Sequence, residues 1–68
     1  MIKCRLKVLL AENDMTQKEL AEKTGIRAPG ISDMCNNKAK QIPIDTLNKL
    51  CNFFQCDITD IYKYEKDN

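Results

Sequence analysis

Apolar side chains recur at three- and four-residue intervals along much of the chain, which is the spacing of one face of an α-helix. Ile2, Leu6 and Leu9 follow this spacing and predict a first helix over about residues 2–12. A second stripe predicts a helix after Pro43, with an apolar face formed by Ile44, Leu47, Leu50, Cys51 and Phe54. We find no convincing strand, so the pattern predicts an all-α fold.

Two further helices are predicted from their end signals. Thr16 can cap the free N–H groups of a helical first turn, and Glu19 completes a capping box, so a helix is expected from here to about Lys23. The next helix begins near residues 27–28 and tolerates Pro29 in its first turn. It ends at Asn36-Asn37, because asparagine tolerates the left-handed conformation that ends many helices.

A fifth, short helix is predicted near the C-terminus. Asp57 caps it, and Asp60 favours the same end electrostatically. The tail at residues 65–68 is expected to be frayed. Together these elements predict a compact five-helix domain, and residues 1–68 leave no room for a second domain.

Residues 16–38 carry the most specific pattern in the chain. Ala21 is small enough for two helices to cross closely, and Gly25, four residues later, permits a sharp left-handed turn. Ile31, six residues further, fills the angle between the helices. This spacing predicts a helix-turn-helix. The predicted core residues are Leu20, Ala21, Ile31, Leu47 and Phe54.

The segment resembles the Cro/C1-type (XRE-like) helix-turn-helix family of small bacterial and phage transcriptional regulators. The matching residues are 16–21, 24–26, 31–32 and 36–38, and the overall resemblance extends over residues 2–64. It implies a lambda-repressor-like DNA-binding domain whose recognition helix, about residues 28–36, enters the major groove of double-stranded DNA.

The resemblance also implies two sets of DNA contacts. The residues expected to reach base edges are Arg27, Ala28, Pro29, Ser32 and Asp33. The residues expected to contact phosphates are Thr16, Gln17, Asn36, Lys38 and Lys40. The alternative is that these are ordinary solvated side chains, with Arg27 in a surface ion pair and Asp33 a helix-surface acid.

The expected recognition surface departs from the family in its lack of hydrogen-bond donors. Ala28, Pro29 and Gly30 carry no side-chain donor, whereas Asp33 can accept from cytosine N4 but repels phosphates. Asn37 also replaces the glycine usual after the recognition helix. We therefore expect weak direct readout, with specificity drawn from DNA shape or from the spacing of paired half-sites.

Charge is distributed unevenly along the chain. The 68 residues carry 11 Lys+Arg and 10 Asp+Glu, a formal net charge of +1, which alone does not indicate a nucleic-acid binder. Residues 1–44, however, hold eight basic and five acidic side chains, and residues 45–68 hold three and five. The end that bears the helix-turn-helix is mildly basic.

Several kinds of site are not expected. Without histidine, His-dependent catalysis and His-based zinc sites are excluded, and we find no catalytic set, cofactor site or ligand pocket. Four cysteines are interpreted as reduced and mostly buried rather than metal-bound, with Cys51 and Cys56 on different faces of a helix. No signal peptide or membrane span is apparent, so we expect a cytoplasmic protein.

Self-association is expected at the acidic C-terminal end. Candidate residues of a homodimer interface are Phe53, Ile61, Tyr62 and Tyr64. Packing on the domain's own flank would explain these side chains as well. The sequence thus predicts a dimeric DNA-binding regulator, most simply a repressor that occupies its operator. The alternative is a protein-interaction module, such as an antitoxin-like partner, that kept the fold with weak DNA binding.

Overall fold

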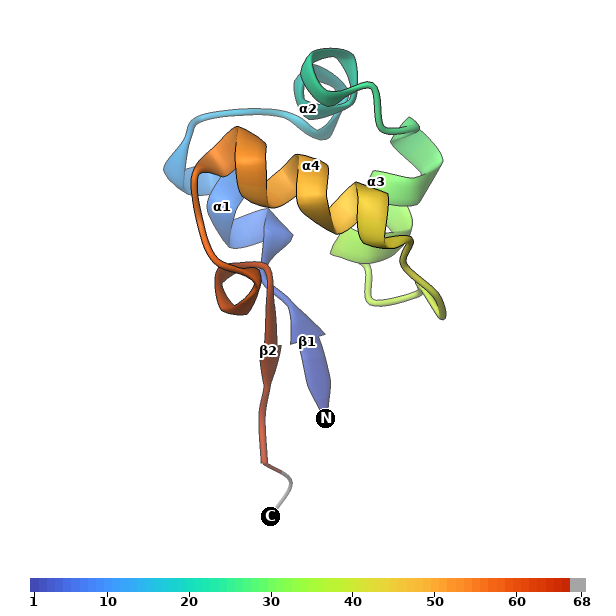
Figure 1. Ribbon diagram of the computed structural model, residues 1–68, viewed down its shortest axis with the longest axis vertical. Helices are drawn as coiled ribbons and strands as arrows, with labels where there is room; N and C mark the ends of the chain where they lie inside the picture. Colours follow the sequence, from blue (N-terminus) through green and yellow to red (C-terminus); the bar gives the residue numbers. More distant parts are fainter. Residues whose placement is uncertain (67–68) are drawn as a thin grey trace.

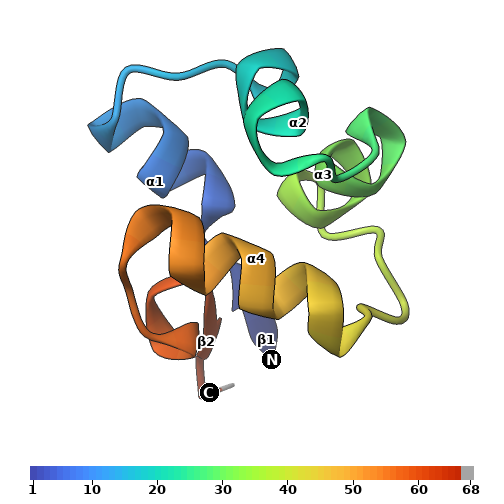
Figure 2. The ribbon, with the colours of Figure 1, turned by 45° about the horizontal axis from the view of Figure 1, so that its top comes forward.

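A computed structural model describes residues 1–66 and consists of helices with one small sheet. The elements in chain order are β1 (Ile2–Cys4), α1 (Leu6–Glu12), α2 (Gln17–Thr24), α3 (Ala28–Cys35), α4 (Ile44–Phe54), the single-turn 3₁₀ helix η1 (Ile58–Asp60) and β2 (Tyr62–Tyr64). The four α-helices form the body, and β1 and β2 lie side by side and project from it as a two-stranded ribbon (Figures 1 and 2). We call β1 and β2 together the terminal ribbon.

The terminal ribbon corrects the all-α, five-helix prediction. Residues 2–4 form a strand rather than the start of the first helix, and residues 62–64 form its antiparallel partner. The expected fifth helix is the single turn η1. The cap predicted for Asp57 is confirmed, and Asp60 completes a capping box with it that was not predicted from the sequence. Ile2 has the spacing of a helical residue but lies in a strand, because β1 pairs with β2. This pairing satisfies the backbone N–H and C=O groups that hydrogen bonds within a helix would otherwise satisfy.

The two faces of the terminal ribbon differ. Cys4 and Tyr62 lie opposite each other and pack against the core, and Ile2 and Tyr64 form the next pair on the same face, where they are 66% and 68% exposed. On the other face, Lys3 pairs with Glu65 at 3.1 Å. Glu65, the first residue of the predicted tail, also donates its backbone N–H to the Met1 carbonyl. Residues 67–68 lie outside the described part of the chain.

One core holds the helices and the ribbon together. The fully buried side chains come from each of the four α-helices and from the residue between η1 and β2; they are Leu6, Leu20, Ile31, Leu50 and Ile61. The predicted burial of Leu20 and Ile31 is confirmed, whereas Ala21, Leu47 and Phe54 are only half-buried. Ile61 is 0% exposed and therefore cannot offer its side chain to a second copy, so its assignment to a dimer interface is wrong.

Each α-helix is followed by a residue in the left-handed conformation. These residues are Asp14, Gly25, Asn37 and Gln55, and only one of them is a glycine. The prediction for Gly25 and Asn37 is confirmed. A non-glycine residue pays a steric cost in this conformation, since its Cβ approaches a carbonyl oxygen.

Two glycine substitutions are expected to have opposite effects on stability. Gln55→Gly should raise the free energy of unfolding by about 0.5–1 kcal/mol, because it relieves left-handed strain and removes only an exposed hydrogen bond to Asn52. Asn37→Gly should lower it by about 0.5–1 kcal/mol, because Asn37 Oδ1 accepts a 3.0 Å hydrogen bond from the backbone N–H of Cys4. Urea denaturation of both variants checks this, and shifts of the same sign would contradict it.

The cysteines are free thiols, but only Cys35 is buried and the other three are half-buried, so the prediction that they are mostly buried is wrong. The placement predicted for Cys51 and Cys56 is wrong as well. Since α4 ends at Phe54, the chain turns back, and the Cys56 N–H donates to the Cys51 carbonyl at 3.1 Å. Their side chains are therefore neighbours, not residues on separate faces of one helix. Burial raises the pKa of the Cys35 and Cys56 thiols, which keeps them protonated and poorly reactive near neutral pH.

None of the helices in residues 1–66 has the length and apolarity needed to cross a bilayer.

Candidate nucleic-acid interface

The N-terminus of α2 is fixed by the predicted capping box. The Glu19 N–H donates to Thr16 Oγ1 at 3.1 Å, and the Thr16 N–H donates to Glu19 Oε1 at 3.1 Å. Gln17 is the first residue of the helix and is half-buried. The free N–H groups of a helical first turn, together with the helix dipole, favour an anion. Thr16 and Gln17 lie at this helix end, together with the Glu19 carboxylate that caps it.

The turn between α2 and α3 is held by two residues. Gly25 adopts φ 77° and donates its N–H to the Ala21 carbonyl at 2.9 Å. Thr24 donates its hydroxyl to the Leu20 carbonyl at 2.7 Å and accepts from the Ile26 N–H at 3.2 Å. No such role was predicted for Thr24. A threonine directly before the turn glycine was the available signal, since threonine hydroxyls readily bond nearby backbone.

Burial on α3 separates its two faces. Ile31, Met34 and Cys35 are buried in the core. The residues predicted to contact bases are on the accessible part of the helix or at its start: Arg27, Ala28, Pro29 and Asp33 are exposed and Ser32 is half-buried. Arg27 forms no ion pair with any residue in 1–66, so the surface ion pair considered from the sequence is not observed.

The segment after α3 is tied to both the helix and the terminal ribbon. The Lys38 N–H donates to the Asp33 carbonyl at 2.8 Å, and the Asn37 N–H donates to Met34 at 3.2 Å. Asn37 Oδ1 then accepts from Cys4 in β1, a contact between residues 33 positions apart. This anchoring role was missed because nothing near Asn37 in the sequence indicates its partner.

The predicted phosphate contacts after α3 are not equivalent. Asn36 Nδ2 lies 3.3 Å from Ser32 Oγ, so a predicted phosphate contact and a predicted base contact restrain each other. Lys38 is exposed directly beyond the helix. Lys40, also exposed, lines a hollow of about 700 Å³ beside β1 together with Ile2 and Lys3. The structure thus groups Asn36 and Lys38 with α3 and places Lys40 closer to the ribbon.

A family model described as the Cro/C1-type HTH DNA-binding domain matches residues 5–67. The chain belongs to this family. The chain is similar to "Uncharacterized HTH-type transcriptional regulator YozG" of Bacillus subtilis (strain 168), with 38% identity over 60 residues that cover 88% of this chain and 71% of that protein. It is also similar in structure to a protein described in "Crystal structure of a putative DNA-binding protein from Bacteroides fragilis", with a TM-score of 0.76 and 35% identity over 93% of this chain and all of that one.

Membership of the Cro/C1-type family confirms the resemblance seen in the sequence. It identifies α2 and α3 as the helix-turn-helix and α3 as the helix that such domains insert into the major groove. The alternative of a protein-interaction module is not favoured, because the matching family is a DNA-binding one. The match also gives no indication of an enzyme.

Proposed function

We propose that the protein is a transcriptional regulator that binds operator DNA in the cytoplasm and acts by occupancy, most simply as a repressor that blocks polymerase. The single observation that supports this most strongly is the geometry of α3. One face is fixed in the core by Ile31 and Met34, and the opposite face is free to enter a groove. The names of the two relatives, a transcriptional regulator and a putative DNA-binding protein, support the same function.

The proposed base contacts are made by a surface that is poor in donors. Arg27 at the start of α3 supplies a guanidinium, and Ala28 and Pro29 present apolar atoms suited to a thymine methyl group. Ser32 supplies a hydroxyl and Asp33 an acceptor for cytosine N4. Such a surface discriminates weakly between bases, so DNA shape and half-site spacing would carry more of the specificity.

The proposed phosphate contacts flank this surface. Thr16 and Gln17 offer the N-terminus of α2, and Asn36, Lys38 and Lys40 follow α3. Neither lysine forms an ion pair with another described residue, which leaves both ammonium groups available for phosphates. These contacts would orient the domain on the duplex without reading sequence.

Selection from a pool of random duplex DNA at two salt concentrations tests the proposal. Enrichment of a motif, together with an affinity that falls steeply as salt rises, is the expected result. Enrichment of paired motifs at a fixed spacing would further support binding as a dimer. No enrichment and no salt dependence would contradict DNA-binding regulation altogether.

Asp33→Ala is expected to change sequence preference more than affinity. The variant removes an acceptor for cytosine and also a charge that repels phosphates, so the two effects on affinity oppose each other. Repeating the selection with this variant should reduce cytosine enrichment at one position of each half-site. Glu22→Ala, which removes an exposed acid from α2, is the matched control. An unchanged motif would show that Asp33 does not read a base.

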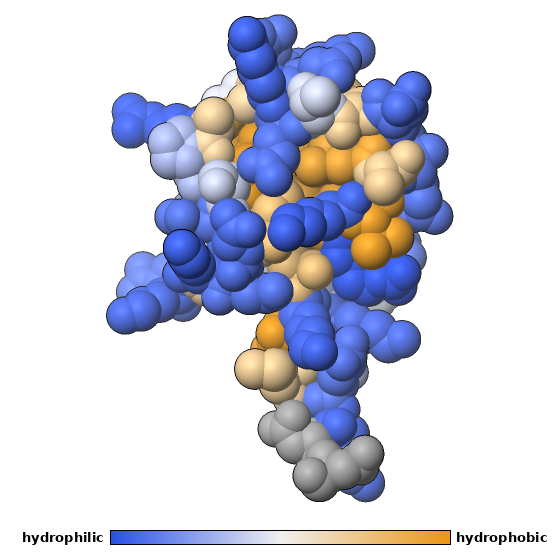
Figure 3. All heavy atoms as spheres, turned by 180° about the vertical axis from the view of Figure 1, so that it is seen from behind, coloured by the Kyte–Doolittle hydropathy of each residue, from blue (hydrophilic) through white to orange (hydrophobic). Residues whose placement is uncertain are grey.

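We further propose that the protein binds DNA as a homodimer that pairs through the terminal ribbon. Ile2 and Tyr64 form a cross-strand pair that is mostly exposed, and Tyr62 continues the same face toward the core. Residues coloured as hydrophobic are visible on the projecting ribbon as well as on the helical body (Figure 3). Phe53 contributes less to this proposal, because its ring already packs edge-on against Phe54 with centroids 5.1 Å apart.

Tyr64→Ala is expected to weaken the dimer by about ten-fold or more, because aromatic residues at interface centres contribute most of the binding energy. Sedimentation equilibrium over a range of protein concentrations measures this change. Tyr64→Phe keeps the ring and should stay within about two-fold of the natural protein. A dimer constant that is the same in all three proteins would exclude the ribbon as the interface.

A further inference from the structure

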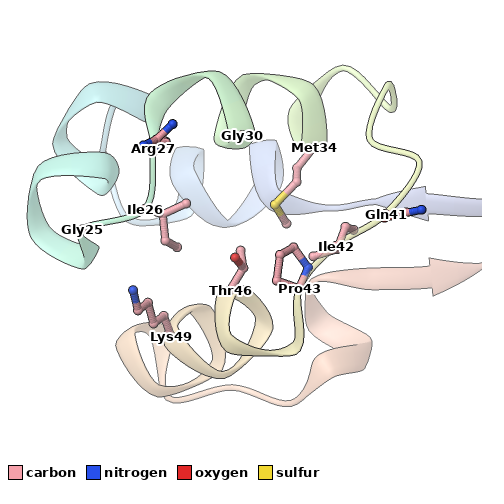
Figure 4. A pocket seen from close by; sticks show the side chains of 10 residues that line it. All are labelled: Gly25, Ile26, Arg27, Gly30, Met34, Gln41, Ile42, Pro43, Thr46 and Lys49. Carbon is pink, nitrogen blue, oxygen red and sulfur yellow. The ribbon is translucent and has the colours of Figure 1, made fainter.

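A cavity of about 300 Å³ opens between α3 and α4 (Figure 4), although no ligand pocket was expected from the sequence. Its apolar lining comes from Ile26, Met34, Ile42 and Pro43. Gly30 also lines the cavity, and a Cβ added there would meet no atom within 4 Å. The cavity is therefore open partly because α3 carries no side chain at this position.

The charged side chains that line the cavity are all basic. Its charged lining residues are Arg27 and Lys49, and no acidic side chain of the described residues lines it. Lys49 extends from α4 along the open side and has no ion pair with any residue in 1–66, whereas Arg27 is turned away from the cavity (Figure 4). The Thr46 side chain points inward from α4 (Figure 4). An apolar interior with one available ammonium group at its edge is complementary to an amphipathic anion.

We propose that this cavity binds a small amphipathic carboxylate, such as a medium-chain fatty acid. The hydrocarbon chain lies against Ile26, Met34 and Ile42, the carboxylate pairs with Lys49, and the Thr46 hydroxyl donates a hydrogen bond to it. The volume lies at the lower end of the range of small-ligand pockets, roughly 300–1,000 Å³. Of the lining residues, only Arg27 is also proposed to read bases, and it is turned away from the cavity (Figure 4), so the site does not depend on the proposed DNA binding.

Titration of the full chain with octanoate, followed by NMR, tests the site. Saturable shifts of the Met34 methyl group and of the Ile26 and Ile42 methyl groups are expected. Gly30→Leu fills the cavity and should weaken octanoate binding about ten-fold or more. Gly30→Ala makes the same helix-favouring change without filling the cavity and should stay within about two-fold. Circular dichroism establishes that both variants are folded.

The charge requirement is tested separately, with a variant of an exposed side chain. Lys49→Gln should weaken octanoate binding about three- to five-fold, the size expected for an accessible ion pair, and leave the binding of octan-1-ol unchanged. Lys63→Gln, on the terminal ribbon, is the control and should change neither. Absence of saturable Met34 shifts, equal affinity of Gly30→Leu and the natural protein, or equal losses for acid and alcohol on Lys49→Gln would each overturn the proposal.

Discussion

Ile31→Ala is expected to lower the free energy of unfolding by about 2–5 kcal/mol. The Ile31 side chain is 0% exposed and packs in the core with Leu20 of α2, where the two helices of the motif meet. Removing the side chain leaves a cavity that α2 and α3 cannot close without changing their crossing angle. A domain of this size has a total stability of roughly 3–10 kcal/mol, so the variant should be partly or largely unfolded at room temperature.

Urea denaturation followed by circular dichroism measures this loss, with Ile44→Ala as the matched control. Ile44 is also an isoleucine in a helix but is 69% exposed, so its replacement should change stability by no more than about 0.5 kcal/mol. Ile31→Val should fall between the two, at about 0.5–1.5 kcal/mol. If the Ile31 and Ile44 variants showed equal stability, the packing role assigned to Ile31 would be wrong.

The helix-turn-helix could be predicted from the sequence because its signals are local. The Thr16–Glu19 capping box, the left-handed Gly25 and the burial of Ile31 each depend on residues within one or two helical turns. The terminal ribbon could not be predicted in the same way. Its strands have three residues each, too few for a periodic pattern, and Cys4 pairs with Tyr62 at the other end of the chain.

In the candidate interface, too, local features could be predicted from the sequence and contacts between distant residues could not. The accessible face of α3 followed from helical periodicity, which places Ile31 and Met34 inward and leaves Asp33 outward. The Asn37–Cys4 hydrogen bond and the position of Lys40 beside β1 depend on a ribbon that was not foreseen. The cavity lined by Gly30 likewise depends on how α4 packs against α3, which cannot be predicted from the residues of either helix alone.

Replacing Lys38 and Lys40 together with alanine is expected to weaken DNA binding about ten-fold or more for all sequences alike. Each ammonium group that neutralises a phosphate releases counterions on binding, so its removal reduces the salt dependence as well as the affinity. The slope of log affinity against log salt should become shallower by about 0.9 for each phosphate that the variant no longer neutralises. Fluorescence anisotropy with one specific and one unrelated duplex, at several salt concentrations, measures both quantities.

The matched control removes two other lysines, Lys63 and Lys66, so that the net charge changes equally. Lys63 lies in β2 and Lys66 lies two residues after it, and both are exposed. Because this is the proposed dimer end of the molecule, sedimentation equilibrium first establishes that the control variant keeps the dimer constant of the natural protein. If the control reduced affinity and slope as much as the Lys38 and Lys40 variant, overall charge and not local contact would explain the effect. If the Lys38 and Lys40 variant altered the motif itself, these side chains would read bases. Lys38, whose N–H is held by the end of α3, is expected to account for the larger part of the weakening, because its backbone is ordered before DNA binds.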